Sequence, residues 1–318
     1  MVRSTETVQL PNEIDIPLLG LGSTHSGGYS HDAVVYGLKT CGYRMIDTAK
    51  RYGVEKFLGQ AIQESGVSRE SIFLISKLWP TDVGYHRAKL AFHESCRRLN
   101  TNYLDCFMLH YPDIPPRLSD DTPPDRIRDD TWHALEQLMD EVKLLSYVRS
   151  IGVSNFTADD LYKLLDNASI RPHINQAEFH PFQNPKSLRA VCANEHVLFM
   201  GYCPLAKGTI LNEPSIADVA KRNGVTAAQT CIRWSIQQRV PAIPKSTKLH
   251  RVKENSEVFN FSLSDSDMAV LSNLNDNRRV IDTSTVLNRL DLSDGYKLQR
   301  SLRECSLSAP STPAAAKR

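Results

Sequence analysis

The chain has 318 residues, of which 41% are hydrophobic and 23% are charged, and its formal net charge is +2. This length and composition indicate a globular protein with one barrel-sized domain or two smaller domains. The nearly balanced charge gives no electrostatic case for binding nucleic acid or a membrane surface. We also expect no membrane-spanning helix, because the sequence lacks a run of about 18 apolar residues.

The cysteines and the N-terminus predict the cellular compartment. The seven cysteines are scattered and odd in number, and no CxxC pair occurs. Most lie in apolar stretches such as LDCFML, so we expect free and mostly buried thiols in a reducing compartment. Residues 1–17 (MVRSTETVQLPNEIDIP) lack the apolar core of a secretory signal. We therefore predict a cytoplasmic protein.

Apolar runs of strand length alternate along the chain with amphipathic stretches of helix length. A short hairpin, TVQLPNEIDIPLLG with its turn at PNE, leads in. The predicted strands are 18–22, 44–48, 72–78, 104–110, 150–154, 174–179, 197–203 and 241–245. The predicted helices are 31–42, 84–99, 126–145, 158–167, 184–195, 216–222, 225–238 and 249–259. Ser30 is the expected N-cap of the first, and Thr157 with Asp160 is expected to form a capping box at the start of the helix over 158–167.

Fully apolar strands between helices predict an α/β protein with a parallel sheet that helices cover. Eight such units without a break in composition favour a closed (β/α)8 TIM barrel, with an N-terminal β-hairpin, over an open sheet. We predict one domain over 1–305 that includes a C-terminal substrate loop. The tail over 306–318 is small, polar and contains proline, so we expect it to be disordered.

In a barrel of this kind, functional side chains belong at the C-terminal ends of the strands. A single lysine or histidine there would more often be a solvated cation or a buried core residue. Polar groups at nearly every strand end are unlikely to be solvated cations or core residues in every case, so together they indicate a functional site. In chain order these groups are Asp47 with nearby Tyr52, Lys77, His110, Ser154, Asn155, Gln176, Tyr202, Lys245 and Ser246.

From about residue 8 to about residue 279 the chain resembles an aldo-keto reductase. The stretches that carry the resemblance are MIDTAKRYGVE, ISKLWP, IGVSNF with the later NQAEFHP, and IPKSTKLHRVKEN. The short stretch after the seventh strand, AKGTILNEPSIADVA, is similar to the short-loop microbial and plant branch of the family. The resemblance implies a general carbonyl reductase.

The resemblance also assigns catalytic roles. Tyr52 would be the proton donor, with Asp47, Lys77 and His110 around it. A free tyrosine has a pKa of about 10, and we expect the neighbouring lysine ammonium to lower that pKa. Asp47 would pair with Lys77, and His110 would hold the carbonyl oxygen of the substrate. The two residues before Tyr52, Lys50 and Arg51, have no counterpart in the motif, so we expect surface charges there.

A nicotinamide cofactor is implied by the same resemblance. No GxGxxG occurs, so a Rossmann cradle is not predicted, and GLGS at 20–23 alone predicts only a tight turn. Ser154, Asn155 and Gln176 would bind the carboxamide, and Tyr202 would stack on the nicotinamide ring.

At the other end of the cofactor, Lys245, Ser246 and Arg251 precede or begin a helix and would hold an adenosine 2′-phosphate. This arrangement favours NADP(H) over NAD(H). The predicted cofactor-binding set also includes Gly22, Ser23, Asp47, Cys203, Leu205, Thr247, Glu254 and Asn255.

We expect the substrate to contact His110, Trp79 and Tyr111, together with the loops at 113–130 and 280–300. Tyr111 stands where the family often has tryptophan. The region 144–147 carries about four residues more than usual, which is close to one helical turn. If this insertion shifted the strand at 150–154, the cofactor groups at its end would be misplaced.

The prediction is therefore an NADP(H)-dependent oxidoreductase that reduces aldehydes or ketones to alcohols and acts as a monomer on a small-molecule carbonyl. One alternative is a cofactor-binding regulatory or structural member of the family with little turnover. Another is a Schiff-base aldolase with Lys77 as nucleophile, which needs a neutral amine, whereas Asp47 favours the charged form. His173, His180 and His196 show no metal-ligand spacing, so no metal site is predicted and a metal hydrolase is not favoured.

Overall fold

The computed structural model describes residues 6–24, 27–115, 118, 122–140 and 147–282. They belong to a compact unit that runs to Asp282. The predicted domain end at 305 and the tail over 306–318 lie outside the described residues. So do residues 141–146, which hold most of the insertion, and most of the predicted loop over 280–300.

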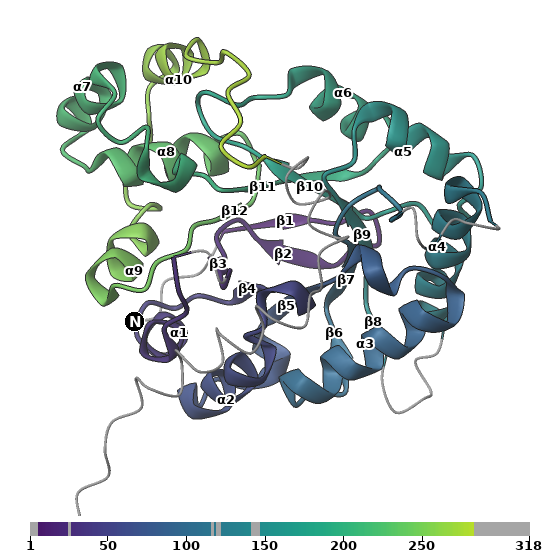
Figure 1. Cartoon of the computed structure of the whole chain (residues 1–318). Coiled ribbons are helices and arrows are strands. Elements are labelled where there is room, and N and C mark those ends of the chain that lie inside the picture. The colour runs from purple at the N-terminus through teal and green to yellow at the C-terminus, as the bar shows by residue number, and fades with distance from the viewer. Residues whose placement is uncertain (1–5, 25–26, 116–117, 119–121, 141–146, 283–318) are drawn as a thin grey trace, which may run out of the picture. The chain divides into compact units, whose positions relative to one another are not determined.

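Eight parallel strands form the centre of the fold (Figure 1). In their order around the sheet they are β3 (Leu21–Gly22), β4 (Met45–Asp47), β5 (Phe73–Leu78), β7 (Cys106–Leu109), β9 (Ile151–Ser154), β10 (Ile174–Glu178), β11 (Leu198–Tyr202) and β12 (Ala242–Ile243). Leu19 forms a parallel bridge with Ala242, whose N–H donates to the carbonyl of Leu18 at 2.9 Å. The last strand therefore joins the first, and the predicted (β/α)8 barrel is confirmed.

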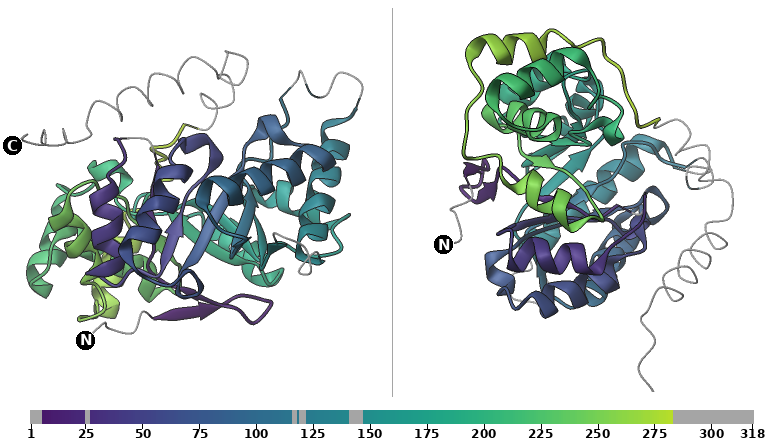
Figure 2. Two further views of the ribbon diagram at one scale, coloured as in Figure 1. Left: turned by 90° about the horizontal axis from the view of Figure 1, so that it is seen from below. Right: turned by 90° about the vertical axis from the view of Figure 1, so that its left-hand side faces the viewer.

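Two small sheets lie beside the barrel. The antiparallel pair β1 (Thr7–Gln9) and β2 (Asp15–Pro17) is the predicted N-terminal hairpin. Leu10 and Ile16 of this hairpin pack against the inward-facing residues of the barrel, so the hairpin covers the N-terminal ends of the strands (Figure 2). The second sheet pairs β6 (Tyr103–Leu104) with β8 (Tyr147–Val148) in parallel.

Helices surround the barrel (Figure 1). They are α1 (His31–Lys39), α2 (Glu55–Ser65), α3 (Tyr85–Leu99), α4 (Pro124–Asp140), α5 (Ala158–Leu165), α6 (Lys186–Asn194), α7 (Pro214–Asn223), α8 (Ala227–Gln237), α9 (Leu249–Ser256) and α10 (Asp265–Ser272). Both predicted N-caps are present: Ser30 Oγ accepts from the N–H of Ala33, and Thr157 forms the capping box with Asp160.

The predicted set of helices lacks α2 and α10, and this part of the prediction is wrong. In α2, Leu58, Ala61, Ile62 and Ser65 are buried. Their spacing is that of one face of a helix, so the pattern for α2 was present in the sequence. No helix in the described part of the chain combines the length and the apolar composition that a bilayer crossing requires.

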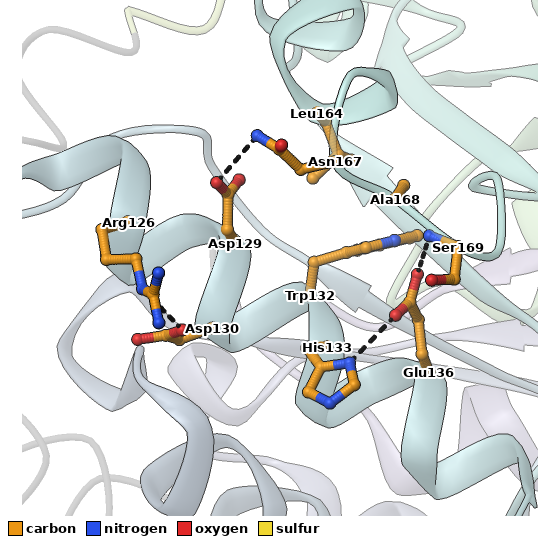
Figure 3. A pocket seen from close by; sticks show the side chains of 10 residues that line it. All are labelled: Arg126, Asp129, Asp130, Trp132, His133, Glu136, Leu164, Asn167, Ala168 and Ser169. Atoms are coloured by element: carbon orange, nitrogen blue, oxygen red, sulfur yellow. Dashed lines mark hydrogen bonds and ion pairs between the residues drawn. The ribbon is translucent and has the colours of Figure 1, made fainter.

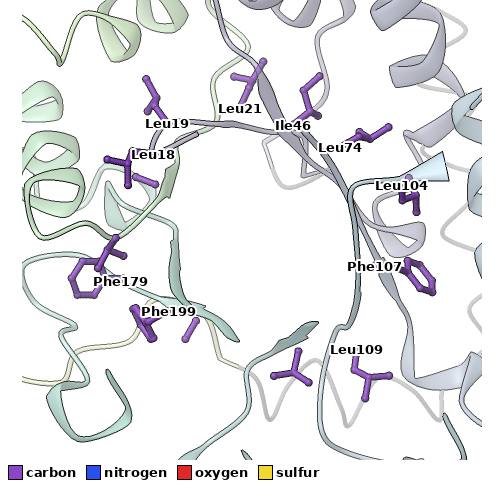
Figure 4. Close-up of a cluster of buried hydrophobic side chains, with 14 of the residues drawn as sticks. Leu18, Leu19, Leu21, Ile46, Leu74, Leu104, Phe107, Leu109, Phe179 and Phe199 are labelled. Atoms are coloured by element: carbon purple, nitrogen blue, oxygen red, sulfur yellow. The ribbon is translucent and has the colours of Figure 1, made fainter. Parts of the chain in front are cut away.

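The strands separate two apolar layers, because successive side chains of a strand point to opposite faces. Leu21, Ile46, Leu74 and Phe107 point away from the barrel axis toward the helices (Figure 4). The inward-facing layer contains Met45, Phe73, Ile75, Cys106, Met108, Ile174, Met200 and Ile243. Gly152 allows β9 and β10 to lie close together at this point, because a Cβ on residue 152 would lie only 2.8 Å from the carbonyl oxygen of Ile174.

Candidate active site

Polar side chains form a layer directly above the apolar interior of the barrel. On five strands, a predicted polar group lies two positions after a buried apolar residue, so both face inward. The pairs are Met45 and Asp47, Ile75 and Lys77, Met108 and His110, Ile174 and Gln176, and Met200 and Tyr202. The alternation within each strand therefore gathers the predicted groups at one end of the barrel.

Lys77 and Asp47 form a buried ion pair at the centre of this layer. Lys77 Nζ lies 2.5 Å from Asp47 Oδ1, and the two side chains are 0% and 3% exposed. Lys77 Nζ also donates to the carbonyl oxygen of Thr48 at 3.1 Å, and Gln176 Nε2 donates to Asp47 Oδ2 at 2.8 Å. Both charges thus have the partners that burial requires.

Tyr52 lies beside this ion pair. It ends the short 3-10 helix η1 (Lys50–Tyr52), which Gly53 terminates in the left-handed conformation with φ of 70°. Lys77 Nζ is 5.6 Å from the centroid of the Tyr52 ring. The edge of the ring faces His110, with a centroid distance of 5.7 Å and an interplanar angle of 79°. The structure therefore brings Tyr52, Lys77 and His110 together, as the sequence predicts.

The direction of the pKa shift of Tyr52 differs from the prediction. Burial raises the pKa of Tyr52 well above its ordinary value, and the negative charge of Asp47 adds to the rise. The expectation of a lowered pKa is wrong because burial removes the hydration that the phenolate needs. A raised pKa keeps the phenol protonated at neutral pH, which suits a proton donor.

Trp79, His110 and Tyr111 form a wall of aromatic rings next to Tyr52. Trp79 meets His110 edge to face at 5.3 Å and Tyr111 at 5.7 Å between ring centroids. His110 and Tyr111 are stacked at 5.0 Å. All three are buried, with exposed fractions of 5% to 8%. The predicted substrate residues are therefore in mutual contact.

Lys50 and Arg51 are not the free surface charges that the sequence suggests. Lys50 Nζ lies 2.8 Å from the carboxylate of Asp82. The guanidinium carbon of Arg51 lies 5.4 Å from the centroid of the Trp79 ring. Consecutive side chains of a 3-10 helix point in different directions. In η1, Lys50 therefore contacts Asp82, whereas Arg51 contacts the ring of Trp79.

The predicted carboxamide-binding groups lie at the end of β9 and in β10, and Tyr202, predicted to stack on the ring, ends β11. Ser154 stands opposite Gln176 in the parallel register, so the insertion before β9 does not displace it. Ser154 Oγ donates to the carbonyl of Gln176 at 3.0 Å. Asn155, with φ of 63°, donates from Nδ2 to the carbonyl of His110 at 2.9 Å. The hydroxyl of Tyr202 donates to Asn155 Oδ1 at 2.8 Å.

Gly22 and Lys245 lie where β3 and β12 meet. A Cβ on Gly22 would lie 3.1 Å from the carbonyl oxygen of Ile243 and 3.3 Å from Lys245 Cβ. The ammonium of Lys245 reaches the loop after β3, since a Cβ built on Gly27 would lie 3.3 Å from Lys245 Nζ. Lys245 is half-buried, and this burial lowers its pKa below the ordinary value.

The segment from Ser246 to α9 forms a turn ahead of the helix. Ser246 Oγ accepts from the N–H of Lys248 at 3.1 Å. Thr247 is half-buried and Arg251, in the first turn of α9, is exposed. Two predicted phosphate-binding cations, Lys245 and Arg251, therefore flank the start of α9.

Three residues of the predicted cofactor set have other partners or positions. Glu254 Oε1 accepts a hydrogen bond from Thr226 Oγ1 at 2.6 Å. Thr226 is the N-cap residue of α8, so the side chain of Glu254 binds the start of that helix. Asn255 is buried within α9. Ser23 donates from its N–H and from Oγ to the carbonyl of Asp47, at 3.0 and 2.8 Å. The prediction of a tight turn over GLGS is wrong, because Leu21 and Gly22 form strand β3.

Cys203 and Leu205 lie in the loop between β11 and the 3-10 helix η5 (Ala206–Gly208). Cys203, Ala206 and Lys207 all have positive φ, of 57°, 45° and 57°. Non-glycine residues with positive φ are uncommon and mark turns or strained sites. Burial raises the pKa of the Cys203 thiol to about 11, so it stays neutral at physiological pH.

The sequence profile of the Aldo/keto reductase family matches residues 19–276. The chain belongs to this family. A Caenorhabditis elegans protein described as an uncharacterized oxidoreductase is 47% identical over 293 residues, which cover 92% of this chain and 89% of that protein. The glyoxal reductase of Bacillus subtilis is 39% identical over 277 residues, covering 86% and 95%. A crystal structure of a Bombyx mori aldo-keto reductase in complex with NADP is similar with a TM-score of 0.81 and 29% identity, covering 91% and 98%.

In this aldo/keto reductase, Glu178 is a buried carboxylate that the sequence reading missed. Its Oε1 accepts from the N–H of Val280 at 2.7 Å, and its Oε2 accepts from the N–H of Ile281 at 3.0 Å. His180 Nε2 lies 2.9 Å from Oε1 of this carboxylate. Lys207 Nζ donates to the carbonyl of Val280 at 2.8 Å. Glu178 thus fastens residues 280–281 to the end of β10.

A further pocket of the reductase lies between α4 and α5 (Figure 3). Of the predicted site, only Arg126, Asp129 and Asp130 from the substrate segment 113–130 line it, and these three residues belong to α4. Within it, Glu136 Oε1 accepts from the N–H groups of Ser169 and Ile170 at 2.7 and 2.8 Å. This carboxylate therefore holds the loop after α5. Over the residues that the structure describes, no three His, Cys, Asp or Glu side chains are grouped to hold a metal ion.

Proposed function

We propose that this aldo/keto reductase is an NADP(H)-dependent oxidoreductase that reduces aldehydes and ketones to alcohols. The observation that carries the proposal is the position of Tyr52 beside His110 and the buried ion pair of Lys77 and Asp47. A neutral phenol, a fixed cation and an imidazole at one strand end are the groups that protonation of a carbonyl oxygen requires.

When bound, the nicotinamide supplies the hydride that reduces the carbonyl carbon. Tyr52 gives its phenolic proton to the carbonyl oxygen, so the C=O π bond is replaced by one C–H and one O–H bond. His110 orients the carbonyl oxygen toward Tyr52. The phenolate that remains on Tyr52 faces the Lys77 ammonium and regains a proton from water.

The raised pKa of Tyr52 is compatible with this role. An alkoxide is more basic than a phenolate, so the proton transfer remains favourable although burial and Asp47 disfavour ionisation of the free phenol. Asp47 and Gln176 hold the Lys77 ammonium in one position, where it stabilises the phenolate only after the proton has moved.

The residues at the two ends of the polar layer fit NADP(H). Asn155 Oδ1 accepts from Tyr202 and has a second lone pair for a carboxamide N–H. Gly22 lets β3 pack closely against the segment that carries Lys245, since a Cβ there would lie 3.3 Å from Lys245 Cβ. Lys245 and Arg251 supply positive charge for a 2′-phosphate. The Bombyx mori relative in complex with NADP supports the same cofactor here.

Tyr52→Phe tests the proposal, because it removes the hydroxyl but keeps the ring that packs against His110. We expect the wild-type protein to oxidise NADPH with a simple aromatic aldehyde, and the variant to lose about 10²- to 10⁴-fold in kcat. NADPH binding should be unchanged. If wild type and variant are equally inactive while both bind NADPH, the protein is a regulatory or structural member of the family. A borohydride-trapped adduct on Lys77 would instead indicate an aldolase.

We also propose that the enzyme acts as a monomer in the cytoplasm. The described cysteines are free, and Cys96, Cys106, Cys192 and Cys231 are buried, which fits a reducing compartment. Light scattering after size-exclusion chromatography should give the mass of one chain, 35.8 kDa. A mass of two chains would rule out the monomer.

A further inference from the structure

The proposed proton donor lies in a short turn whose residues are not fully buried. Tyr52 ends η1, and each of the three residues of η1 is half-buried. The nearest residues that are buried in the apolar core lie outside the turn, at Ala49 before it and at Val54 after it. Core packing therefore fixes the two ends of this segment, and other contacts orient the turn between them.

The backbone hydrogen bonds of η1 close the turn on itself. The N–H of Tyr52 donates to the carbonyl of Ala49 at 3.0 Å, and the N–H of Gly53 donates to the carbonyl of Lys50 at 3.1 Å. Both bonds join residues that are three apart in the sequence. They set the shape of the turn, whereas its direction over the end of the barrel depends on bonds to other elements.

Lys50, the first residue of η1, forms such a bond. Lys50 Nζ donates to Asp82 Oδ1 at 2.8 Å and also lies 2.8 Å from Asp82 Oδ2. The ammonium therefore lies between both oxygens of one carboxylate. The side chains of Lys50 and Asp82 are 33% and 18% exposed, so the pair is partly shielded from water.

Asp82 is well placed to hold Lys50 because its own turn is anchored to the barrel. It ends the 3-10 helix η3 (Pro80–Asp82), which follows β5 and Trp79. Pro80 is buried, and the N–H of Asp82 donates to the carbonyl of Trp79 at 2.9 Å. The ion pair thus joins the turn that carries Tyr52 to the turn that begins after Trp79 of the aromatic wall.

The position of Lys50 in η1 makes this bond relevant to the phenol. Lys50 lies two residues before Tyr52, which is about 4 Å along a 3-10 helix. A rotation of η1 about its two ends would therefore move the phenol relative to His110, whose ring lies 5.7 Å from that of Tyr52 between centroids. A displacement of about 1 Å at a reacting group can lower a rate about 10²-fold.

We propose that the ion pair of Lys50 and Asp82 holds η1 in the orientation that places the Tyr52 hydroxyl at the carbonyl oxygen of the substrate. Lys50 and Asp82 are positioning residues in this role, because they act on the reaction through Tyr52. Both side chains are partly exposed, so the pair contributes little to the stability of the whole barrel. The inference rests on the proposed function, since it concerns the rate at which Tyr52 protonates a carbonyl oxygen.

Exchange of the two charges tests the proposal. The variants are Lys50→Gln, Asp82→Asn, the neutral double variant that combines these two changes, and the swapped variant Lys50→Asp/Asp82→Lys. Lys56→Gln removes an exposed cation on α2 and is the control. Each protein is loaded with NADPH and mixed with a simple aromatic aldehyde at several concentrations. The loss of NADPH absorbance then gives the rate of a single turnover, so product release does not mask the proton transfer.

We expect Lys50→Gln and Asp82→Asn each to lower the single-turnover rate at saturating aldehyde about 10-fold, while KM changes less than about twofold. Both changes break the same bond, so the neutral double variant should be no slower than either single variant. The swapped variant should regain most of the wild-type rate, because it keeps the ion pair and the combined length of the two side chains. The urea midpoint and the dissociation constant of NADPH should stay the same, and Lys56→Gln should match the wild type.

Three results would overturn the positioning role and leave the proposed function intact. In the first, Lys50→Gln reduces the aldehyde as fast as the wild type. In the second, the losses of the two single variants multiply in the neutral double variant, so the residues act independently; this comparison also decides if the swapped variant does not fold. In the third, the swapped variant folds and is slower than Lys50→Gln, which means that Lys50 acts through its charge. A wild-type protein that reduces no simple aldehyde would contradict both the proposed function and this inference.

Discussion

Lys77 Nζ lies 2.5 Å from Asp47 Oδ1 at the top of the apolar barrel interior, and neither side chain is more than 3% exposed. Each charge would be strongly unfavourable there without the other. The pair is therefore a structural element as well as part of the proposed mechanism, and its two roles can be measured separately.

A double-mutant cycle measures the structural role. Asp47→Asn or Lys77→Met leaves one buried charge without its partner, so each should lower the free energy of unfolding by about 3–5 kcal/mol. The double variant should lose less than the sum of the two, because no uncompensated charge remains. Urea unfolding of the four proteins gives the coupling energy. Additive losses would mean that the two charges do not stabilise each other.

Tyr52 should remain protonated beyond the pH range of an ordinary tyrosine. Burial and the charge of Asp47 raise its pKa above 10.0, so the unfolded chain releases this proton before the folded protein does. The stabilising contribution is complete below pH 10 and is lost as the pH rises further. The phenolate absorbance of the wild type minus that of Tyr52→Phe reports this ionisation. A titration in the difference curve below pH 10 would contradict the shift.

Lys245 and Arg251 should discriminate between the two nicotinamide cofactors. Lys245→Met or Arg251→Gln removes a cation near the start of α9, so NADPH should bind about 10- to 100-fold more weakly while NADH is affected little. Lys253→Gln, an exposed cation on the same helix, is the control. Quenching of tryptophan fluorescence gives the dissociation constants. Equal weakening of both cofactors would exclude a phosphate-reading role.

Glu178→Gln should release residues 280–281 from the end of β10. The two carboxylate oxygens bind different N–H groups, those of Val280 and Ile281. An amide offers a single acceptor oxygen, so one N–H faces an NH₂ donor at a cost of about 1–3 kcal/mol. Hydrogen exchange at these two amides should accelerate.

Glu136→Gln is the matched control for Glu178→Gln. The same oxygen, Oε1, binds both Ser169 and Ile170, so one amide oxygen can keep both bonds. Exchange at Ser169 and Ile170 should change little in this variant. A similar acceleration in both variants would mean that the second carboxylate oxygen of Glu178 contributes nothing.

The barrel could be predicted because a buried parallel strand is apolar on both faces and ends at a polar residue. Each predicted strand overlaps an observed one. Helix α2 carried an equally clear signal in Leu58, Ala61 and Ile62, yet it directly follows the motif around Tyr52. The motif MIDTAKRYGVE ends at Glu55, the first residue of α2, so the two signals overlap in the sequence.

The site was predictable in its residues and less so in its electrostatics. Strand ends place Asp47, Lys77 and His110 together whatever the exact twist of the barrel. The sequence names the neighbours of Tyr52 but not how deeply they bury it, and burial decides the direction of the pKa shift. The partners of Glu178, Val280 and Ile281, are 102 and 103 residues away along the chain. A local sequence pattern therefore cannot predict this contact.

The alternation of side chains inside the barrel has a consequence for how such an enzyme changes. Methionines and isoleucines below the polar ring, such as Met108 and Ile174, affect folding but do not touch the chemistry. Residues in the connecting turns, such as Arg51, belong to none of the strands. Laboratory evolution toward new substrates should therefore accumulate changes in these turns, while the strands tolerate conservative exchanges that leave turnover intact.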